Sequence, residues 1–316
     1  MKKKLLFPCI IIIIIIIIII YILCIPQSAV EAAADGLILW YEKILPSLLP
    51  FVILSNFLIQ SSELSFCITW LHKFSNHILP TSTGGTFVLL TGFLFGFPMG
   101  SKNCAELLRN GQIDLAEANI LFAITNNISP VFINSYILLQ QLKQPSLFLG
   151  SLALIYGPPL IYGAFQLQAL KSSSDGYLLS NKKTASRSKI NFQIIDAGIM
   201  NGFETLCRIG GYIMLFSIIV SMIKHLPLPQ YLQTFLVGTL EITNGIEFLT
   251  TTIASEKLRY IFAMTFTAFG GLCGIAQTAS MIRNTGLSIV NYVKTKLLLT
   301  ACTTALSCIA AFCMYK

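Results

Sequence analysis

The chain has 316 residues, of which 55% are hydrophobic and only 11% are charged. A soluble globular domain carries about 25% charged residues, so this composition excludes an ordinary soluble fold. The net charge of +8 is compatible with nucleic-acid binding, but the basic residues gather between apolar runs, as membrane topology requires. Apolar runs of about 20 residues recur along the chain and predict an all-α, polytopic membrane protein with no nucleic-acid partner.

Residues 1–34 are expected to form an N-terminal membrane anchor and linker. Lysines at 2–4 precede an apolar stretch that contains an isoleucine run at 10–20, and such lysines stay on the cytoplasmic side. A cleaved signal peptide is the alternative, because small residues follow at Ser28 and Ala29. The apolar stretch is longer than a usual signal core, which favours a retained anchor.

The next two segments are expected to be a span and an interfacial helix. Residues 36–60 are apolar and contain Pro46 and Pro50, and prolines leave carbonyls unpaired, which predicts a kinked or half-unwound helix. Residues 61–80 are amphipathic, which predicts a helix at the membrane interface or half of a hairpin.

The stretch 92–133 organises the rest of the chain. A helix is expected to break at Gly96, Pro98 and Gly100, because proline removes a backbone donor and glycine relaxes the backbone. A short helix follows, and the next apolar helix is expected to break at 125–130. Bare backbone groups at membrane depth must face protein or a wet cavity, which is how transporters build substrate sites.

A basic segment at 171–190 divides the chain and is expected to be a cytoplasmic loop. Before it, residues 146–170 form a predicted span with a kink at 157–159. The second half is expected to contain spans at 194–223, 232–249, 260–279 and 297–314. The expected interruptions of these spans lie at 241–245 and 270–277.

Weak internal similarity indicates a duplication. Gly96 and Gly111 bracket the first interrupted hairpin, and Gly271 and Gly286 bracket a second one at the same spacing. The predicted repeats are residues 35–170, including a connecting helix, and residues 191–316. They begin on opposite sides of the membrane, so they form inverted repeats with broken helices or re-entrant hairpins, and a site is expected between them.

This topology places Lys294 and Lys296 outside the cell, mildly against the charge rule. Lys102, Arg208 and Arg283 lie in or beside broken apolar segments, where a cation usually pairs or serves a ligand. For Lys102 and Arg208 both interpretations stay open, whereas pairing or snorkelling is favoured for Arg283. Partners available for pairing are Glu106, Glu204 and Glu241, and the i,i+4 spacing of Glu204 and Arg208 suits an ion pair.

Uncharged polar residues cluster at the breaks, and helix starts after Gly100 and Pro130 point positive dipole ends at the expected cavity. This arrangement favours an anionic substrate, with interhelical hydrogen bonding as the alternative. The predicted substrate-binding residues are Pro98, Gly100, Ser101, Lys102, Asn126, Asn127, Ser129, Glu204, Arg208, Glu241, Thr243, Asn244 and Gln277.

Enzyme and metal motifs are absent from the sequence. It contains no HExxH, GxSxG, phosphate-binding glycine loop or pair of intramembrane aspartates. The nine cysteines form no CxxC pair, and His72 and His77 are badly spaced for a shared metal. The prediction is therefore a protein that is not an enzyme and has no cofactor, metal centre or disulfide framework.

Several segments carry a family resemblance. PSLLPF at 46–51, GFPMGSK at 96–102, TNNISPVF at 125–132, LEITNG at 240–245 and GGLCGIAQ at 270–277 resemble the YlbJ-type sporulation integral membrane proteins. That family is placed in the nucleoside-recognition, or Gate-domain, group and is related in architecture to concentrative nucleoside transporters. The resemblance implies a multi-pass protein of the cell membrane, located in the outer forespore membrane during sporulation.

The resemblance also implies a function, which is transport of dipicolinate from the mother cell across the outer forespore membrane. Dipicolinate is a planar pyridine dicarboxylate, so Lys102, Arg208, helix N-termini and amide side chains would be its partners. One alternative is a Gate-type transporter of nucleosides or other small polar solutes, with cation coupling through Glu204 and Glu241. Another is a non-transporting sporulation scaffold. Such folds often form homo-oligomers, and the sequence sets no number.

Overall fold

The computed structural model describes residues 2–60, 64–76, 78–173 and 192–314, and these ranges are helical with no strand among them. Helices long and apolar enough to cross a membrane are Leu115–Gln141, Pro145–Ser172, Ile195–Lys224, Glu256–Met281 and Ile289–Met314. A sixth span is counted if the bent pair Ile12–Cys24 and Pro26–Ile44 crosses once. The prediction of an all-α, multi-pass membrane protein is confirmed, whereas most of the predicted basic loop lies outside the described residues.

The helices of the first half, in chain order, are α1 (Lys2–Cys24), α2 (Pro26–Leu39), the π-helix η1 (Trp40–Ile44), α3 (Leu45–Gln60), α4 (Leu64–Ser75), α5 (Thr83–Phe95), α6 (Met99–Arg109), α7 (Leu115–Thr125), α8 (Pro130–Phe132), the π-helix η2 (Ile133–Gln141), the 3₁₀-helix η3 (Pro145–Leu147) and α9 (Phe148–Ser173). Those of the second half are α10 (Phe192–Lys224), α11 (Gln230–Leu240), α12 (Ile242–Thr252), α13 (Glu256–Phe269), α14 (Gly271–Met281) and α15 (Ile289–Met314).

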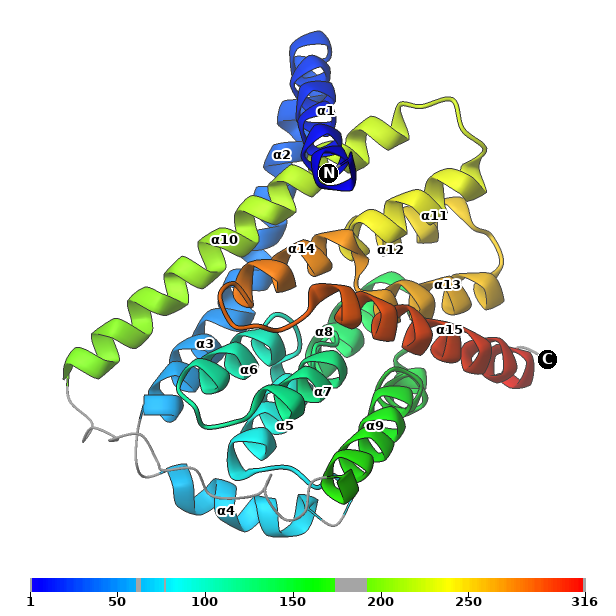
Figure 1. Cartoon of the computed structure of the whole chain (residues 1–316). Helices are drawn as coiled ribbons and strands as arrows, with labels where there is room; N and C mark the ends of the chain where they lie inside the picture. The colour runs from blue at the N-terminus through cyan, green and yellow to red at the C-terminus, as the bar shows by residue number, and fades with distance from the viewer. Residues whose placement is uncertain (1, 61–63, 77, 174–191, 315–316) are drawn as a thin grey trace.

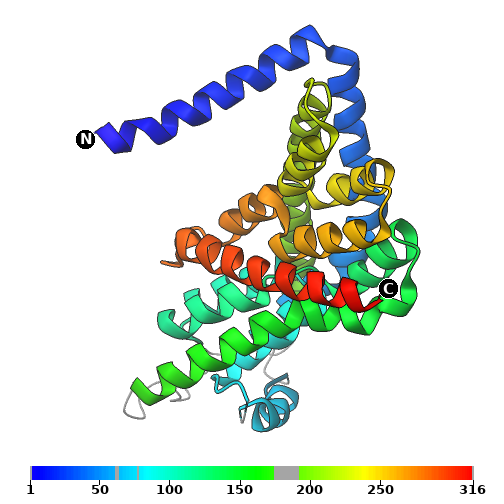
Figure 2. The ribbon, with the colours of Figure 1, turned by 90° about the vertical axis from the view of Figure 1, so that its right-hand side faces the viewer.

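The N-terminal helices have two arrangements: α1 projects from the molecule, and α2 and α3 pack against α10. Helix α1 bends away from α2 by 112° and extends from the body of the molecule (Figure 2). Helices α2 and α3 pack along the long helix α10 (Figure 1). Their interface brings a segment from each half of the chain together at one side of the molecule.

Of the two forms expected for residues 36–60, a kinked or a half-unwound helix, the half-unwound form is wrong. The chain stays helical from α2 to α3, with Pro50 inside α3, and the irregularity is the π-helix η1 directly before it. In a π turn each N–H bonds one residue further back than in an α-helix, as the Leu45 N–H does to the Trp40 carbonyl directly before Pro46. Helix α9 is continuous through Pro158 and Pro159, and the kink expected at 157–159 stays a prediction.

The two breaks predicted in the first half are confirmed. Helix α5 ends at Phe95 and α6 begins at Met99, and α7 ends at Thr125 before α8 begins at Pro130. The breaks bond to each other, because the Phe97 N–H donates to the Asn127 carbonyl at 2.6 Å. Each break therefore satisfies a backbone group that the other exposes.

The breaks of the second half are shorter than predicted. Helix α11 passes to α12 through Glu241, and α13 passes to α14 at Gly270, so Gln277 lies inside α14. Positive φ angles occur at Gly96, Gly111, Gly271 and Gly286, the four glycines that bracket the two hairpins in the sequence. The hairpins share this backbone feature, whereas the division of the whole chain into two repeats stays a prediction.

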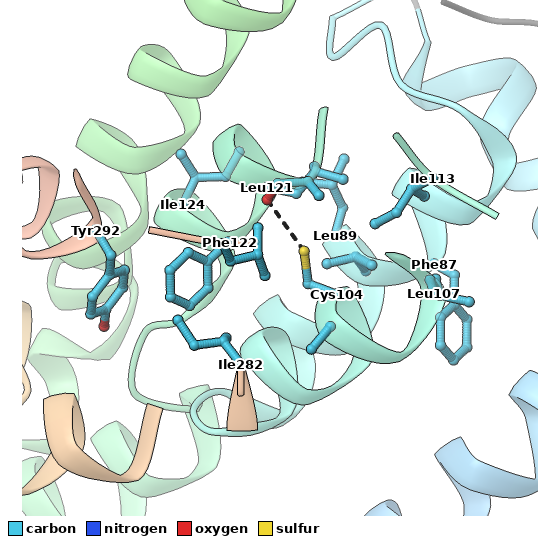
Figure 3. Packing of buried hydrophobic residues seen from close by; sticks show 14 of the residues in the cluster. Phe87, Leu89, Cys104, Leu107, Ile113, Leu121, Phe122, Ile124, Ile282 and Tyr292 are labelled. Carbon is cyan, nitrogen blue, oxygen red and sulfur yellow. Dashed lines mark hydrogen bonds between the residues drawn. The ribbon is translucent and has the colours of Figure 1, made fainter. Parts of the chain in front are cut away.

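A buried apolar cluster holds the first hairpin against α7 and the start of α15 (Figure 3). In it the rings of Phe122 and Tyr292 lie 4.7 Å apart, and the Cys104 thiol donates to the Ala118 carbonyl at 3.3 Å. The cysteine thus acts as a small buried side chain with a weak donor. This packing fixes the position of both breaks.

Gly100 is expected to be required for the contact between α6 and the end of α7. A Cβ at this position would lie 2.5 Å from the Thr125 carbonyl oxygen. Gly100→Ala should therefore destabilise the protein by about 1–3 kcal/mol, the usual cost of overpacking, and lower the midpoint of thermal unfolding. Gly150→Ala is the control, because α9 leaves open space there. Equal midpoints for the two variants would contradict this close packing.

Candidate functional site

A cavity of about 430 Å³ lies where the helix breaks meet. Phe97 and Pro98 line it from the α5–α6 break, Ser129 from the α7–α8 break and Glu241 from the α11–α12 break. Segments of both halves of the chain therefore contribute to one space. Of the predicted substrate-binding residues, those that line the cavity are Pro98, Ser129, Glu241, Thr243 and Gln277.

The walls of the cavity are mostly apolar and include several aromatic rings. Phe51 and Phe95 stack with their ring centroids 4.3 Å apart, and Phe132 lies 4.9 Å from Tyr136. The Tyr136 hydroxyl donates to the Thr243 carbonyl at 3.1 Å, which connects η2 to α12. Aromatic walls with a few polar groups are typical of sites for small planar ligands.

Glu241 is the acidic residue of the cavity, and its carboxylate caps α12. It accepts hydrogen bonds from the Thr243 N–H at 3.0 Å, the Asn244 N–H at 2.8 Å and the Asn244 side-chain amide at 2.8 Å. The carboxylate thus occupies this helix N-terminus and satisfies its donors. Asn244 serves the cap and does not line the cavity.

The N-termini of α6 and α8, which were predicted to attract an anion, differ in whether a side chain caps their free N–H groups. The start of α8 is capped by Ser129, whose hydroxyl accepts from the Phe132 N–H at 3.3 Å. The start of α6 follows Pro98, which provides no side-chain cap, although the Ser101 hydroxyl turns back to donate to the Pro98 carbonyl at 2.7 Å. Of the two, only the start of α6 lacks a side-chain cap.

Lys102 is buried but lies outside the cavity lining. Its ammonium donates to the Asn56 side-chain oxygen at 2.7 Å, and the Asn56 amide donates to the Gly198 carbonyl at 3.2 Å. This chain of bonds connects α6 to α3 and α10. Gly100 and Ser101 are also absent from the cavity lining. Gly100 instead packs against Thr125 at the end of α7.

Arg208 and Glu204 form an ion pair on the surface of α10. Their side chains are 52% and 66% exposed, and neither lines the cavity. An exposed pair of this kind contributes little to stability. The geometry matches the intrahelical pairing that their spacing indicates and gives neither residue a contact with the cavity.

Asn126 and Asn127 stand at the α7–α8 break and bind other parts of the protein. The Asn126 amide donates to the Thr278 and Tyr292 hydroxyls at 2.6 and 2.9 Å. Lys296 donates to the Asn126 carbonyl at 3.0 Å and to the Asn127 side-chain oxygen at 2.9 Å. The two asparagines therefore tie the break to α14 and α15.

Sequence reasoning missed several residues of this region. Lys43 and Tyr136 line the cavity, and Lys296 is buried beside the break. The sequence did contain a signal for Lys296. This lysine directly precedes a long apolar run, and a lysine within an apolar membrane helix is costly unless it has a partner. Lys43 carried no such signal, since it follows Glu42 at the edge of an apolar segment, where charges are ordinary.

Within the described ranges, no three histidine, cysteine or acidic side chains lie together as candidate metal ligands. The fold and the cavity define a multi-pass α-helical membrane protein with broken helices around an internal space. The chain matches no protein-family profile and no solved structure. It is similar to the sporulation integral membrane protein YlbJ of Bacillus subtilis strain 168, with 28% identity over 309 residues, 86% of this chain and 75% of that protein.

Lys102→Ala is expected to act on stability, because the substitution leaves the buried Asn56 side-chain oxygen without this donor. An unsatisfied buried polar group costs about 1–3 kcal/mol, so the midpoint of thermal unfolding of the purified protein should fall. Lys73→Ala, an exposed lysine on α4, is the control and should leave the midpoint unchanged. A Lys102→Ala protein that keeps its midpoint but loses ligand binding would show that Lys102 acts on the ligand.

Proposed function

We propose that the chain is a secondary transporter that binds a small planar anion in the cavity and passes it across the bilayer. The observation that carries this proposal is the meeting of three helix breaks around one internal space. Breaks at membrane depth require internal partners for their backbone groups, and transporters use such breaks to build substrate sites. Rocking of the two halves about this site would expose it to each side in turn.

The lining of the cavity supports a planar, anionic substrate. Phe97 and Phe132 offer ring faces, and the exposed Lys43 offers an ammonium that can bind a carboxylate. The charge of Glu241 is already satisfied by three N–H donors, which lowers the cost of placing an anion nearby.

Dipicolinate meets these requirements, since it is a planar pyridine ring with two carboxylates. Similarity to a sporulation integral membrane protein supports this choice. We therefore propose that the protein moves dipicolinate from the mother cell across the outer forespore membrane. In this proposal Lys43 takes the role that the sequence offered to Lys102 and Arg208, because it is the lysine among the lining residues.

A neutral heterocycle such as a nucleoside is the second candidate substrate. Glu241, Thr243 and Gln277 bring polar groups to the lining of the cavity, and with Lys43 the lining contains one basic and one acidic side chain. A site with one cation and one anion suits a polar solute without net charge. The two candidates differ in their dependence on Lys43, which is needed by a carboxylate and dispensable for a nucleoside.

Lys43→Gln is expected to raise the half-saturating concentration for dipicolinate about tenfold, because a hydrogen bond to a charged group contributes roughly 1.5–3 kcal/mol. The measurement is uptake of labelled dipicolinate by liposomes that contain the purified full chain. Arg208→Gln is the matched control, since Arg208 is a cation on α10 outside the cavity.

Competition with uridine in the same liposomes separates the two substrates. Uridine that blocks uptake, with affinity unchanged in Lys43→Gln, would favour the nucleoside alternative. Folded protein that transports neither solute would contradict the transport proposal and leave a sporulation scaffold as the better hypothesis.

A further inference from the structure

Lys296 lies in the first half of α15 and is only 2% exposed. Its ammonium donates to the Asn126 carbonyl at 3.0 Å and to the Asn127 side-chain oxygen at 2.9 Å. Both acceptors belong to the α7–α8 break. Both acceptors are uncharged oxygens, so neither hydrogen bond pairs the Lys296 ammonium with a carboxylate.

The α7–α8 break concentrates oxygen atoms that favour a cation. Helix α7 ends at Thr125, and the last carbonyls of a helix lack intrahelical partners and carry its negative dipole end. The side-chain oxygen of Asn126 is also buried and accepts no hydrogen bond. Unwound carbonyls and helix C-termini of this kind bind the coupling cation in broken-helix transporters.

We propose that Lys296 is a tethered cation whose ammonium occupies a site in the α7–α8 break that would otherwise accept Na⁺. An ammonium carried by the chain cannot diffuse away from the break, so its presence there does not depend on the Na⁺ concentration. The inference rests on the proposed function in one respect, namely that the break takes part in transport. It follows that a Na⁺ gradient does not drive transport through this break.

The site itself can be tested without a substrate. Thermal unfolding of the purified full chain is measured in NaCl and in choline chloride at equal ionic strength. The wild-type midpoint should be the same in both salts, and Lys296→Ala should lower it in choline chloride. In NaCl, Na⁺ should enter the vacated space and raise the Lys296→Ala midpoint by about 3 °C or more. This increase should level off as the Na⁺ concentration rises, as expected for binding at one site.

Two further variants distinguish Na⁺ binding in the space left by Lys296 from a general loss of stability. Lys296→Met removes the charge but fills much of the space, so its midpoint should be low in both salts. Lys294→Ala removes an exposed lysine from the same helix and should behave as the wild type. A folded Lys296→Ala protein with equal midpoints in both salts would overturn the proposal.

A second measurement uses the wild-type protein and does not depend on the folding of any variant. Initial uptake of dipicolinate or uridine by liposomes is compared with and without an inward Na⁺ gradient. Equal rates are expected, and a rate more than twofold higher with Na⁺ would sink the proposal. If neither solute is taken up, the proposed function fails, while the comparison of the two salts still decides the role of Lys296.

Discussion

The structure depends on pairing the backbone groups that its broken helices expose. In lipid no water is available to satisfy an N–H or a carbonyl, so each break must find its partner inside the protein. The α5–α6 and α7–α8 breaks do this for one another through the bond from Phe97 to Asn127. Lys296 supplies a further donor from α15, which makes a distant helix part of the same arrangement.

The cavity follows from this pairing. Helices that end near one another cannot fill the space between their ends as completely as continuous helices do, and the gap is lined by the side chains that flank the breaks. Here those side chains are mainly aromatic and aliphatic, with Glu241 held in place by the start of α12. Polar residues at the breaks therefore divide into two groups, those that face the space and those that hold the breaks together.

This division explains why the candidate site was only partly predictable. Pro98, Ser129 and Thr243 lie at breaks that composition locates, and they line the cavity. Lys102 and Asn126 have the same kind of sequence context, yet their partners are Asn56 in one case and Thr278 and Tyr292 in the other. A sequence shows that a polar residue needs a partner in an apolar environment, but not which helix supplies it.

The sequence by itself determined the class of protein, the positions of the main breaks and the glycines that allow them. These features follow from local chemistry, namely apolar length, the missing proline donor and the freedom of glycine to adopt positive φ. Only the tertiary structure decided that Lys43 lines the cavity, that Arg208 does not line it and that Lys296 reaches the α7–α8 break. Their roles depend on which helices pack side by side, and that choice is made by contacts between residues far apart in the chain.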